Sequence, residues 1–320
     1  MAGPINSGSV ISKRAMDRQY FLRNCKKQKG LILAAAFFTA YIFIFSYVPV
    51  WGWLMAFQEF KPALGIFGSE WVGFKQFNTL FNESKFMLVI RNTLAMSFIN
   101  IFLSFSSAIL LAILLNEVRA VVFKRTIQTI SYLPHFVSWV VAANLVMTTL
   151  SIDDGAFNNV LMALRIIKEP VLWLGNPNYF WMIIGISNVW KEVGWNAIIY
   201  LAVIASIDPA LYEAASIDGA GRIQRILRIT MPSLVPIIRL LLIMQCGWIL
   251  STGFEQQLLL QNSMVIGVAD VLDTYTLRYG IFMNRYSYAT AAGIFKSVVS
   301  IVLLWTSNYA AKKISGEGVM

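Results

Sequence analysis

Long apolar segments alternate with short polar ones along most of this chain. An α-helix needs about 20 consecutive apolar residues to cross a bilayer. Six segments reach that length, and they cover residues 31–57, 86–115, 127–150, 181–206, 237–261 and 289–311. The pattern therefore predicts an all-α membrane protein with six transmembrane helices.

Composition favours a membrane protein over a large soluble helical protein. Hydrophobic residues make up 58% of the 320 positions and charged residues only 13%, about half the charged share of a typical soluble domain. We expect a basic tail over 1–30, one membrane domain over 31–311 and a short polar tail over 312–320. The first apolar run is too long for a signal-peptide core, so it is expected to remain as an uncleaved anchor.

The net charge of +10 carries information about orientation. If the six spans alternate in direction, sixteen Lys and Arg residues fall on the side of the two tails and the segment around 207–236. Only seven fall on the opposite side. Cytoplasmic loops carry the excess of basic residues, so we expect a multi-pass protein of the plasma (inner) membrane with both termini in the cytoplasm. The loop 151–180 is then external, and the charge gives no reason to expect nucleic-acid binding.

The polar interruption at 207–236 predicts two short helices joined by a tight turn. Ala-rich sequence up to Ile217 favours a helix. Asp218-Gly219 supplies the turn, because glycine tolerates backbone angles that other residues avoid. The residues 222–230 then alternate Ile or Leu with Arg, as an amphipathic helix does. We expect an elbow at the membrane surface that offers a small Ala-rich knob to a partner.

This elbow resembles the EAA motif of ABC-importer permeases, the loop that docks into the ATP-hydrolysing subunit. Met231-Pro232 stands where the motif usually has Leu-Pro. The resemblance implies a set of ATPase-coupling residues, namely Glu213, Ala214, Ala215, Asp218, Gly219, Ala220 and Pro232. The alternative is an amphipathic helix lying on anionic lipid, which accounts for 222–230 but not for the knob and its turn.

Four further segments resemble the LplB-like polysaccharide and oligosaccharide permeases. They are 131–139 (SYLPHFVSW), 190–200 (WKEVGWNAIIY), 253–256 (GFEQ) and 269–278 (ADVLDTYTLR). The resemblance implies the type I ABC importer permease fold and a carbohydrate substrate, an oligosaccharide or polysaccharide that is acidic in some members. It also implies partners: a second homologous permease subunit, making a heterodimer, two cytoplasmic ATP-binding subunits and an extracytoplasmic solute-binding protein. ATP and Mg belong to the ATPase subunits, and this chain is expected to bind no cofactor.

The sequence offers no arrangement of residues for catalysis. It has no G-x-x-x-x-G-K-[ST] phosphate loop, a single histidine, His135, and no Cys pair at zinc spacing. The acidic pair Asp153-Asp154 precedes Gly155 and is typical of an ordinary turn. We therefore expect a non-catalytic membrane subunit without a metal site, in which His135 is satisfied by protein or water.

Polar residues within the fourth and fifth spans are candidates for the substrate pathway, because such residues usually face a bundle interior or a water-filled cavity. Amides and indole rings suit a sugar, whose hydroxyls need hydrogen-bond partners. The candidates are Asn188, Lys191, Glu192, Trp195, Asn196, Glu255, Gln256 and Gln257. Helical spacing puts Asn188, Glu192 and Trp195 on one face, with Lys191 one step around. The alternative is that Lys191, Glu192 and Glu255 neutralise one another and lock helices together.

The leading prediction is the permease subunit of an ATP-driven carbohydrate importer. An ABC permease for another solute, such as a polyamine or an amino acid, is the nearest alternative. An ion-coupled secondary transporter would often show two inverted halves and broken helices, and a membrane-embedded enzyme would need the catalytic groups that this sequence lacks. The identity, length and charge of the sugar stay open at this point.

Overall fold

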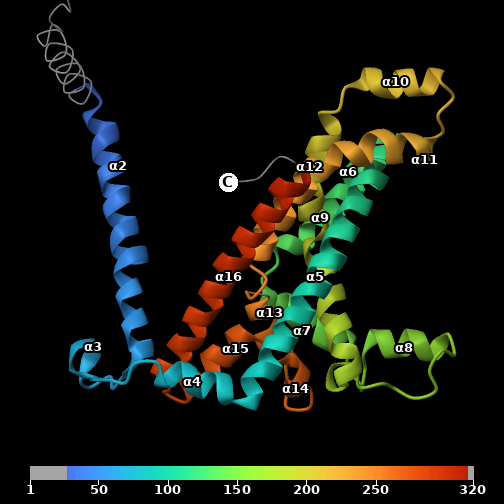
Figure 1. The fold of residues 1–320 in the computed structure, drawn as a ribbon. Coiled ribbons are helices and arrows are strands. Elements are labelled where there is room, and N and C mark those ends of the chain that lie inside the picture. Colours follow the sequence, from blue (N-terminus) through green and yellow to red (C-terminus); the bar gives the residue numbers. More distant parts are fainter. Residues whose placement is uncertain (1–26, 252, 316–320) are drawn as a thin grey trace, which may run out of the picture. The chain divides into compact units, whose positions relative to one another are not determined.

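The computed structural model describes residues 27–251 and 253–315, and Figure 1 shows its helices. Contacts divide the chain into two units, with the boundary between Leu54 and Met55. Of the predicted basic tail, 1–30, all but the last four residues lie outside the described part of the chain.

The first unit is built on one apolar helix. α2 (Lys29–Ile42) continues through a π-helical turn, η1 (Phe43–Tyr47), into a 3-10 helix, η2 (Val48–Phe57), which crosses the boundary between the units. The combined segment Lys29–Phe57 is long and apolar enough to span a membrane. It agrees with the predicted first span.

The second unit opens with a small hairpin. Two strands, β1 (Gln58–Glu59) and β2 (Glu70–Trp71), pair antiparallel with Gln58 opposite Trp71. The short helix α3 (Gly65–Gly68) lies between the strands in sequence, and α4 (Lys75–Asn82) follows them.

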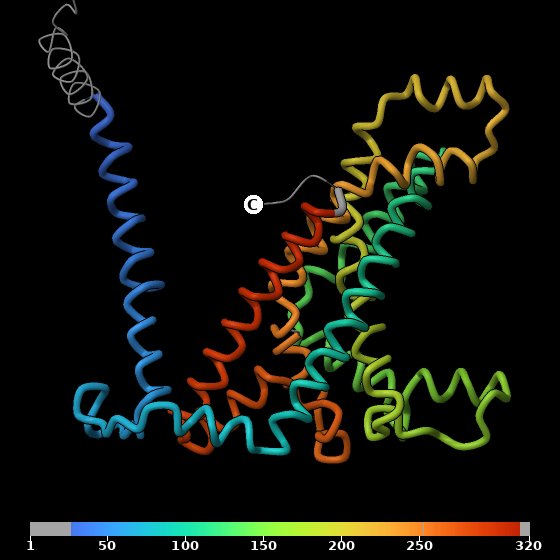
Figure 2. The backbone as a smooth tube through the Cα atoms, viewed as in Figure 1, coloured from blue at the N-terminus to red at the C-terminus, as the bar shows by residue number. Residues whose placement is uncertain are grey.

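The centre of the second unit is a bundle of long helices (Figures 1 and 2). α5 (Ser84–Glu117) packs along α9 (Pro177–Ala205), and α12 (Met231–Gly247) contacts both α9 and α16 (Tyr286–Ser315). Gly185 lets α5 and α9 approach closely, because a Cβ there would lie 2.7 Å from a methyl of Leu103. Apolar side chains from α5, α9 and α12 form one core cluster, namely Ala108, Ala112, Ala197, Tyr200, Ile204 and Leu234.

The third span, predicted over 127–150, is a bent pair of helices. α6 (Val121–Tyr132) runs into a 3-10 turn, η3 (Leu133–Phe136), and α7 (Trp139–Thr149) then leaves at 105°. Pro134 lacks the N–H that a continuing helix needs, and Val137 and Ser138 take extended backbone angles. The Ser138 hydroxyl then accepts from the N–H of Val141 at 3.4 Å and caps α7.

The predicted fifth span, 237–261, is wrong at both ends. The helix begins at Arg222, in α11 (Arg222–Arg225), continues through the π-helical turn η5 (Ile226–Thr230) into α12, and ends at Gly247. A separate short helix, α13 (Phe254–Leu260), starts after Gly253, whose φ of +55° is in the left-handed region. The polar residues of α13 are therefore separated from α12 by a break and do not lie along one continuous helix.

Short helices complete the second unit. α8 (Ala156–Ala163) and the 3-10 turn η4 (Trp173–Gly175) lie between α7 and α9, while α14 (Ile266–Ala269), α15 (Leu272–Leu277) and the π-helical turn η6 (Arg278–Phe282) precede α16. Among the described residues, four helices can each span a membrane, and the count is six when each of two bent pairs is taken as one span. The bent pairs are α6 with α7 and α9 with α10 (Pro209–Ile217). The predicted all-α fold with six spans is confirmed.

Candidate functional site

The predicted elbow forms at one end of the second unit, where α10 and α11 are joined by a tight turn (Figure 1). Asp208 caps α10, because its carboxylate accepts from the N–H of Ala210 at 2.9 Å. Gly219 has a φ of +78°, an angle that other residues rarely adopt. The N–H of Ala220 closes the turn by donating to the carbonyl of Ala215 at 2.8 Å. The local signals of the sequence therefore correspond to real features of the backbone.

Side chains hold the two arms of the elbow together. Arg225 donates to the Ser216 hydroxyl at 2.9 Å, and the hydroxyls of Tyr212 and Thr230 lie 2.9 Å apart. Arg222 forms an ion pair of 3.8 Å with Glu117 at the end of α5. These contacts make the elbow one body that is connected to the helix bundle.

The outer face of the elbow is small and partly apolar. Glu213 and Ala214 are exposed, and Ile217 is 87% exposed. Ala215 and Ala220 are half-buried, next to the turn. Pro232 lies in the first turn of α12, directly after the π-helical turn η5, a geometry that accommodates a missing N–H.

A polar cavity of about 290 Å³ lies between α5, α9, the end of α12 and the following segment. Its polar lining comes from Ser97, Asn100, Ser104, Asn188, Glu192, Asn196, Gln245 and Ser251, with the ring of Trp248 beside them. A second hollow of about 210 Å³ shares Ser104, Asn196 and Gln245 with it, so the two adjoin. We call the first of these the cavity.

Helix periodicity explains this lining. On α9 the polar residues recur at every fourth position, and on α5 they recur at spacings of three and four, so each set makes one stripe along its helix. Asn196 joins the stripes by donating to the Ser104 hydroxyl at 3.0 Å. The buried Asn100 Oδ1 has no hydrogen-bond partner among the described residues. Asn100 therefore presents unused hydrogen-bonding capacity inside an apolar bundle.

Five of the eight sequence candidates lie outside the cavity lining. Trp195 is exposed and stacks on His135, with ring centroids 4.3 Å apart. Glu255 is exposed on α13, whereas Gln256 is buried and donates to the Ile184 carbonyl at 2.8 Å. Gln257 is 0% exposed, and neither of its amide atoms has a partner among the described residues. The fifth of these candidates is Lys191, which is also buried.

Lys191, Glu192 and His135 form what we call the cavity-wall cluster. Lys191 Nζ donates to Glu192 Oε1 at 3.0 Å, and Glu192 Oε2 lies 2.7 Å from His135 Nδ1. The Lys191–Glu192 pair agrees with the neutralisation alternative, while Glu255 takes no part in an ion pair within the described residues. His135 has polar partners, as expected.

Two of the segments that resemble sugar permeases, 131–139 and 190–200, meet at this cluster. Gly194 makes the meeting possible, because a Cβ there would lie 2.1 Å from the carbonyl oxygen of Ser131. Nothing in the sequence links these two segments. Ser97, Asn100 and Ser104 of α5 and Gln245 of α12 were not among the sequence candidates, although the first three recur at helical spacing.

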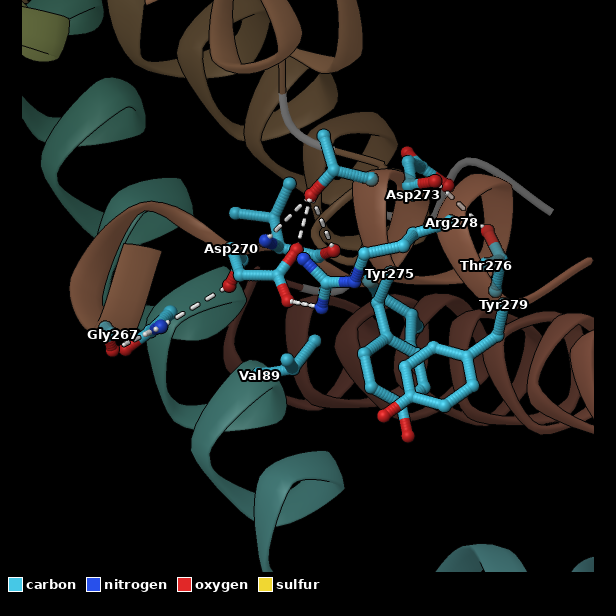
Figure 3. Close-up of polar contacts among 12 residues, drawn as sticks. Val89, Gly267, Asp270, Asp273, Tyr275, Thr276, Arg278 and Tyr279 are labelled. Atoms are coloured by element: carbon cyan, nitrogen blue, oxygen red, sulfur yellow. Dashed lines mark hydrogen bonds and ion pairs between the residues drawn. The ribbon is translucent and has the colours of Figure 1, made fainter. Parts of the chain in front are cut away.

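The segment 269–278 contributes to a different group, which we call the anchor cluster and which Figure 3 shows in part. Asp270 pairs with Arg278 and also accepts from the Thr274 hydroxyl at 2.8 Å, and Asp273 pairs with Lys296 of α16. Asn92 of α5 donates to the carbonyls of Gly267 and Asp270 at 2.9 and 3.1 Å. These bonds fix α14 and α15 between α5 and α16.

Glu83, just before α5, completes the anchor cluster. It accepts from the hydroxyls of Tyr279 at 2.9 Å and Tyr288 at 2.5 Å. Burial acts to raise the pKa of Glu83, but the bonds from Tyr288 and Tyr279 and the charge of Arg285 outweigh it and hold the pKa below its ordinary value. Glu83 is therefore bound in its charged form.

Known proteins share this architecture. A family model described as "Binding-protein-dependent transport system inner membrane component" matches residues 101–316. The chain is 42% identical to Protein LplB of Bacillus subtilis (strain 168) over 294 residues, which are 92% of each chain. It is also 42% identical to the polygalacturonan/rhamnogalacturonan transport system permease protein YteP of the same organism, over 97% of this chain and 96% of YteP.

Solved structures agree with these relatives. A chain from a bacterial ABC transporter involved in the import of the acidic polysaccharide alginate matches with a TM-score of 0.85 and 40% identity, over 92% of this chain and 99% of that chain. The same score and identity hold for the alginate transporter in complex with a periplasmic protein that carries an alginate pentasaccharide.

The long helices of the second unit enclose a polar cavity, and the elbow lies at one end of that unit, an arrangement typical of a membrane permease. The chain belongs to the family of binding-protein-dependent transport system inner membrane components. The predicted importer permease fold and the resemblance to carbohydrate permeases are both confirmed.

Proposed function

We propose that this chain is the sugar-translocating permease subunit of an ATP-driven importer. The observation that carries the proposal is the cavity, in which amide and hydroxyl stripes of α5 and α9 face one another at the centre of an apolar bundle. Unsatisfied polar groups are costly at membrane depth, so their presence favours a polar solute that uses them. The names of LplB, YteP and the alginate transporter support a carbohydrate, an oligosaccharide or polysaccharide, as that solute.

The proposed assembly has four kinds of component. A second homologous permease subunit pairs with this chain as a heterodimer, and two cytoplasmic ATP-binding subunits, which hold the ATP and Mg, supply the energy. An extracytoplasmic solute-binding protein delivers the sugar, a partner supported by the alginate transporter complex. In this assembly, ATP hydrolysis is assigned to the ATP-binding subunits, and this chain is a non-catalytic subunit.

The energy source gives the direct test of this function. The full complex, reconstituted in proteoliposomes with its binding protein, is expected to accumulate a labelled oligosaccharide only with Mg-ATP at the ATPase subunits. Accumulation should persist when ionophores collapse proton and sodium gradients. If uptake stops when the gradients are collapsed although ATP is still present, the protein is a secondary transporter. ATP-driven uptake of an amino acid or a polyamine, but of no sugar, would reject carbohydrate as the substrate class.

The elbow is proposed to dock into an ATPase subunit. An exposed Ala-rich surface beside Ile217 allows close approach, and Glu213 can accept from a partner arginine. Docking requires the elbow and both termini to be cytoplasmic and α8 to be external. Impermeant reagents should then label a single cysteine at Val160, which is 55% exposed on α8, from outside only.

Gly219 offers a sharp test of coupling. Valine at this position must adopt a φ near +78°, which costs about 1–3 kcal/mol. We expect Gly219→Val to lower binding-protein-stimulated ATPase activity and uptake. Gly221→Val is the matched control, because Gly221 has an ordinary φ of −68° and open space around it. Equal behaviour of the two variants would contradict a coupling role for this turn.

A further inference from the structure

The cavity lining contains one ionisable residue, and two residues outside the lining bind its carboxylate. Among the described residues that line the cavity, only Glu192 carries a titratable side chain. Lys191 occupies one of its carboxylate oxygens, at 3.0 Å, and His135 the other, at 2.7 Å. Neither Lys191 nor His135 lines the cavity itself.

Lys191 contacts the cavity lining through Glu192. The Lys191 side chain is 6% exposed. Its remaining partners are the carbonyl of His135, at 2.9 Å, and the ring of Trp139, whose centroid lies 5.3 Å from Nζ. Neither of these partners lines the cavity, so Lys191 is not in a position to bind a sugar directly.

We propose that Lys191 is a specificity-determining positioning residue, which neutralises Glu192 so that the cavity admits sugars bearing carboxylate groups. The inference rests on the proposed sugar-importer function. Lys191 and Glu192 together contribute no net charge to the wall, whereas Glu192 alone contributes −1. Like charges repel more strongly in a low-dielectric interior than in water. A sugar carboxylate therefore passes a neutral wall but is repelled by an uncompensated one.

Lys191 also has a structural contact, and the two roles predict different results. Its bond to the His135 carbonyl connects α9 to the bend between α6 and α7. Loss of that contact should impair every sugar to the same extent. Loss of the positive charge should impair acidic sugars more than neutral ones. The ratio of the two uptake rates therefore separates charge compensation from structure.

The experiment uses an oligogalacturonate and its methyl ester of equal length, because the ester keeps the shape and removes the charge. Uptake of each is measured in the reconstituted complex with its binding protein, relative to the unsubstituted complex. Lys191→Met should reduce uptake of the acid about tenfold more than uptake of the ester. Lys191→Arg should keep the original ratio of acid uptake to ester uptake. Glu192→Gln should raise that ratio. The double variant should return it close to the original value.

Lys296→Met is the matched control, because Lys296 also forms a half-buried pair with a carboxylate, Asp273, but outside the cavity lining. It should not change the ratio. Equal loss of both probes in Lys191→Met, or the same selectivity in Lys296→Met, would overturn the inference. If the Lys191→Met complex fails to assemble, an unchanged ratio of acid uptake to ester uptake in Glu192→Gln would also overturn the inference. Uptake of the ester alone by the unsubstituted complex overturns the inference but leaves the importer function intact, whereas uptake of neither probe counts against both.

Discussion

The cavity and the anchor cluster both bury polar side chains against α5, but they satisfy them differently. In the anchor cluster, Asp270 has Arg278 and Thr274 as partners, and Glu83 has two tyrosine hydroxyls. In the cavity, Asn100 keeps an acceptor without a partner among the described residues, and the lining borders open volume. Saturated polar groups hold helices in place, whereas groups with spare capacity can bind a ligand.

The difference also appears in the charges. Asp270 and Asp273 each pair with a cation from a different turn or helix, so each pair connects parts of the fold. Glu192 pairs with its own neighbour in sequence, Lys191, and with His135. The cavity-wall cluster therefore places a charged pair at a cavity lining as well as connecting α9 to η3, whereas the anchor cluster fixes the position of α14 and α15. Two substitutions test this contrast, and a third tests a buried position outside both regions.

The largest effect is expected from breaking the anchor cluster. Arg278→Met leaves Asp270, whose side chain is 5% exposed, without its cation. Removing one partner of a buried pair typically costs about 3–5 kcal/mol, so the variant should lower the yield and the melting temperature of the complex. Transport per folded complex should be retained. The measurement is a thermal melt of the purified complex beside an uptake assay.

The double variant Asp270→Asn with Arg278→Met is the control for uncompensated charge. It should recover part of the lost melting temperature, because no buried charge remains without a partner. A normal melting temperature with lost transport in Arg278→Met would contradict the contrast and would assign the anchor cluster to the transport pathway.

The elements predicted well are those with strong local signals. Asp218-Gly219 determines its own turn, so the turn of the elbow could be predicted to within a residue or two, and long apolar runs indicated five of the six spans. The second arm of the elbow is not the separate short helix that was predicted, because it continues to Gly247. The fifth span was misplaced because the apolar sequence continues past Gly247, where the helix ends. The left-handed Gly253 that follows the break cannot be distinguished from a helical glycine by composition alone.

The missing parts of the candidate site depend on contacts between distant residues. His135 and Glu192 are 57 positions apart, and Asn196 and Ser104 are 92 apart. No local pattern links such residues. Asn188, Glu192 and Asn196 could be found because they recur at helical spacing on one helix, whereas the facing stripe on α5 consists of small polar residues in a strongly apolar segment.

A moderate effect, on transport alone, is expected in the cavity. Asn188→Leu removes an amide from the lining of the cavity. Uptake should fall about tenfold, the equivalent of roughly 1.4 kcal/mol, with an unchanged melting temperature. Asn178→Leu, in the exposed first turn of α9, is the matched control and should behave as the original protein does. A lowered melting temperature with normal transport per complex would make Asn188 a structural residue.

The smallest effect is expected at Gln257, a sequence candidate that belongs to neither region. Its side chain is fully buried, and its amide atoms have no partner among the described residues. Replacing an unsatisfied buried polar group by an apolar one of similar shape is nearly neutral or stabilising, so Gln257→Leu should change stability by less than about 1 kcal/mol. Gln256→Leu is the contrasting variant, because it removes the bonds from Gln256 to Ile184 and Ser187, and it should melt at a lower temperature. Should Gln257→Leu instead abolish uptake while its melting temperature stays unchanged, the amide would belong to the substrate pathway, and the buried position would have to open during transport.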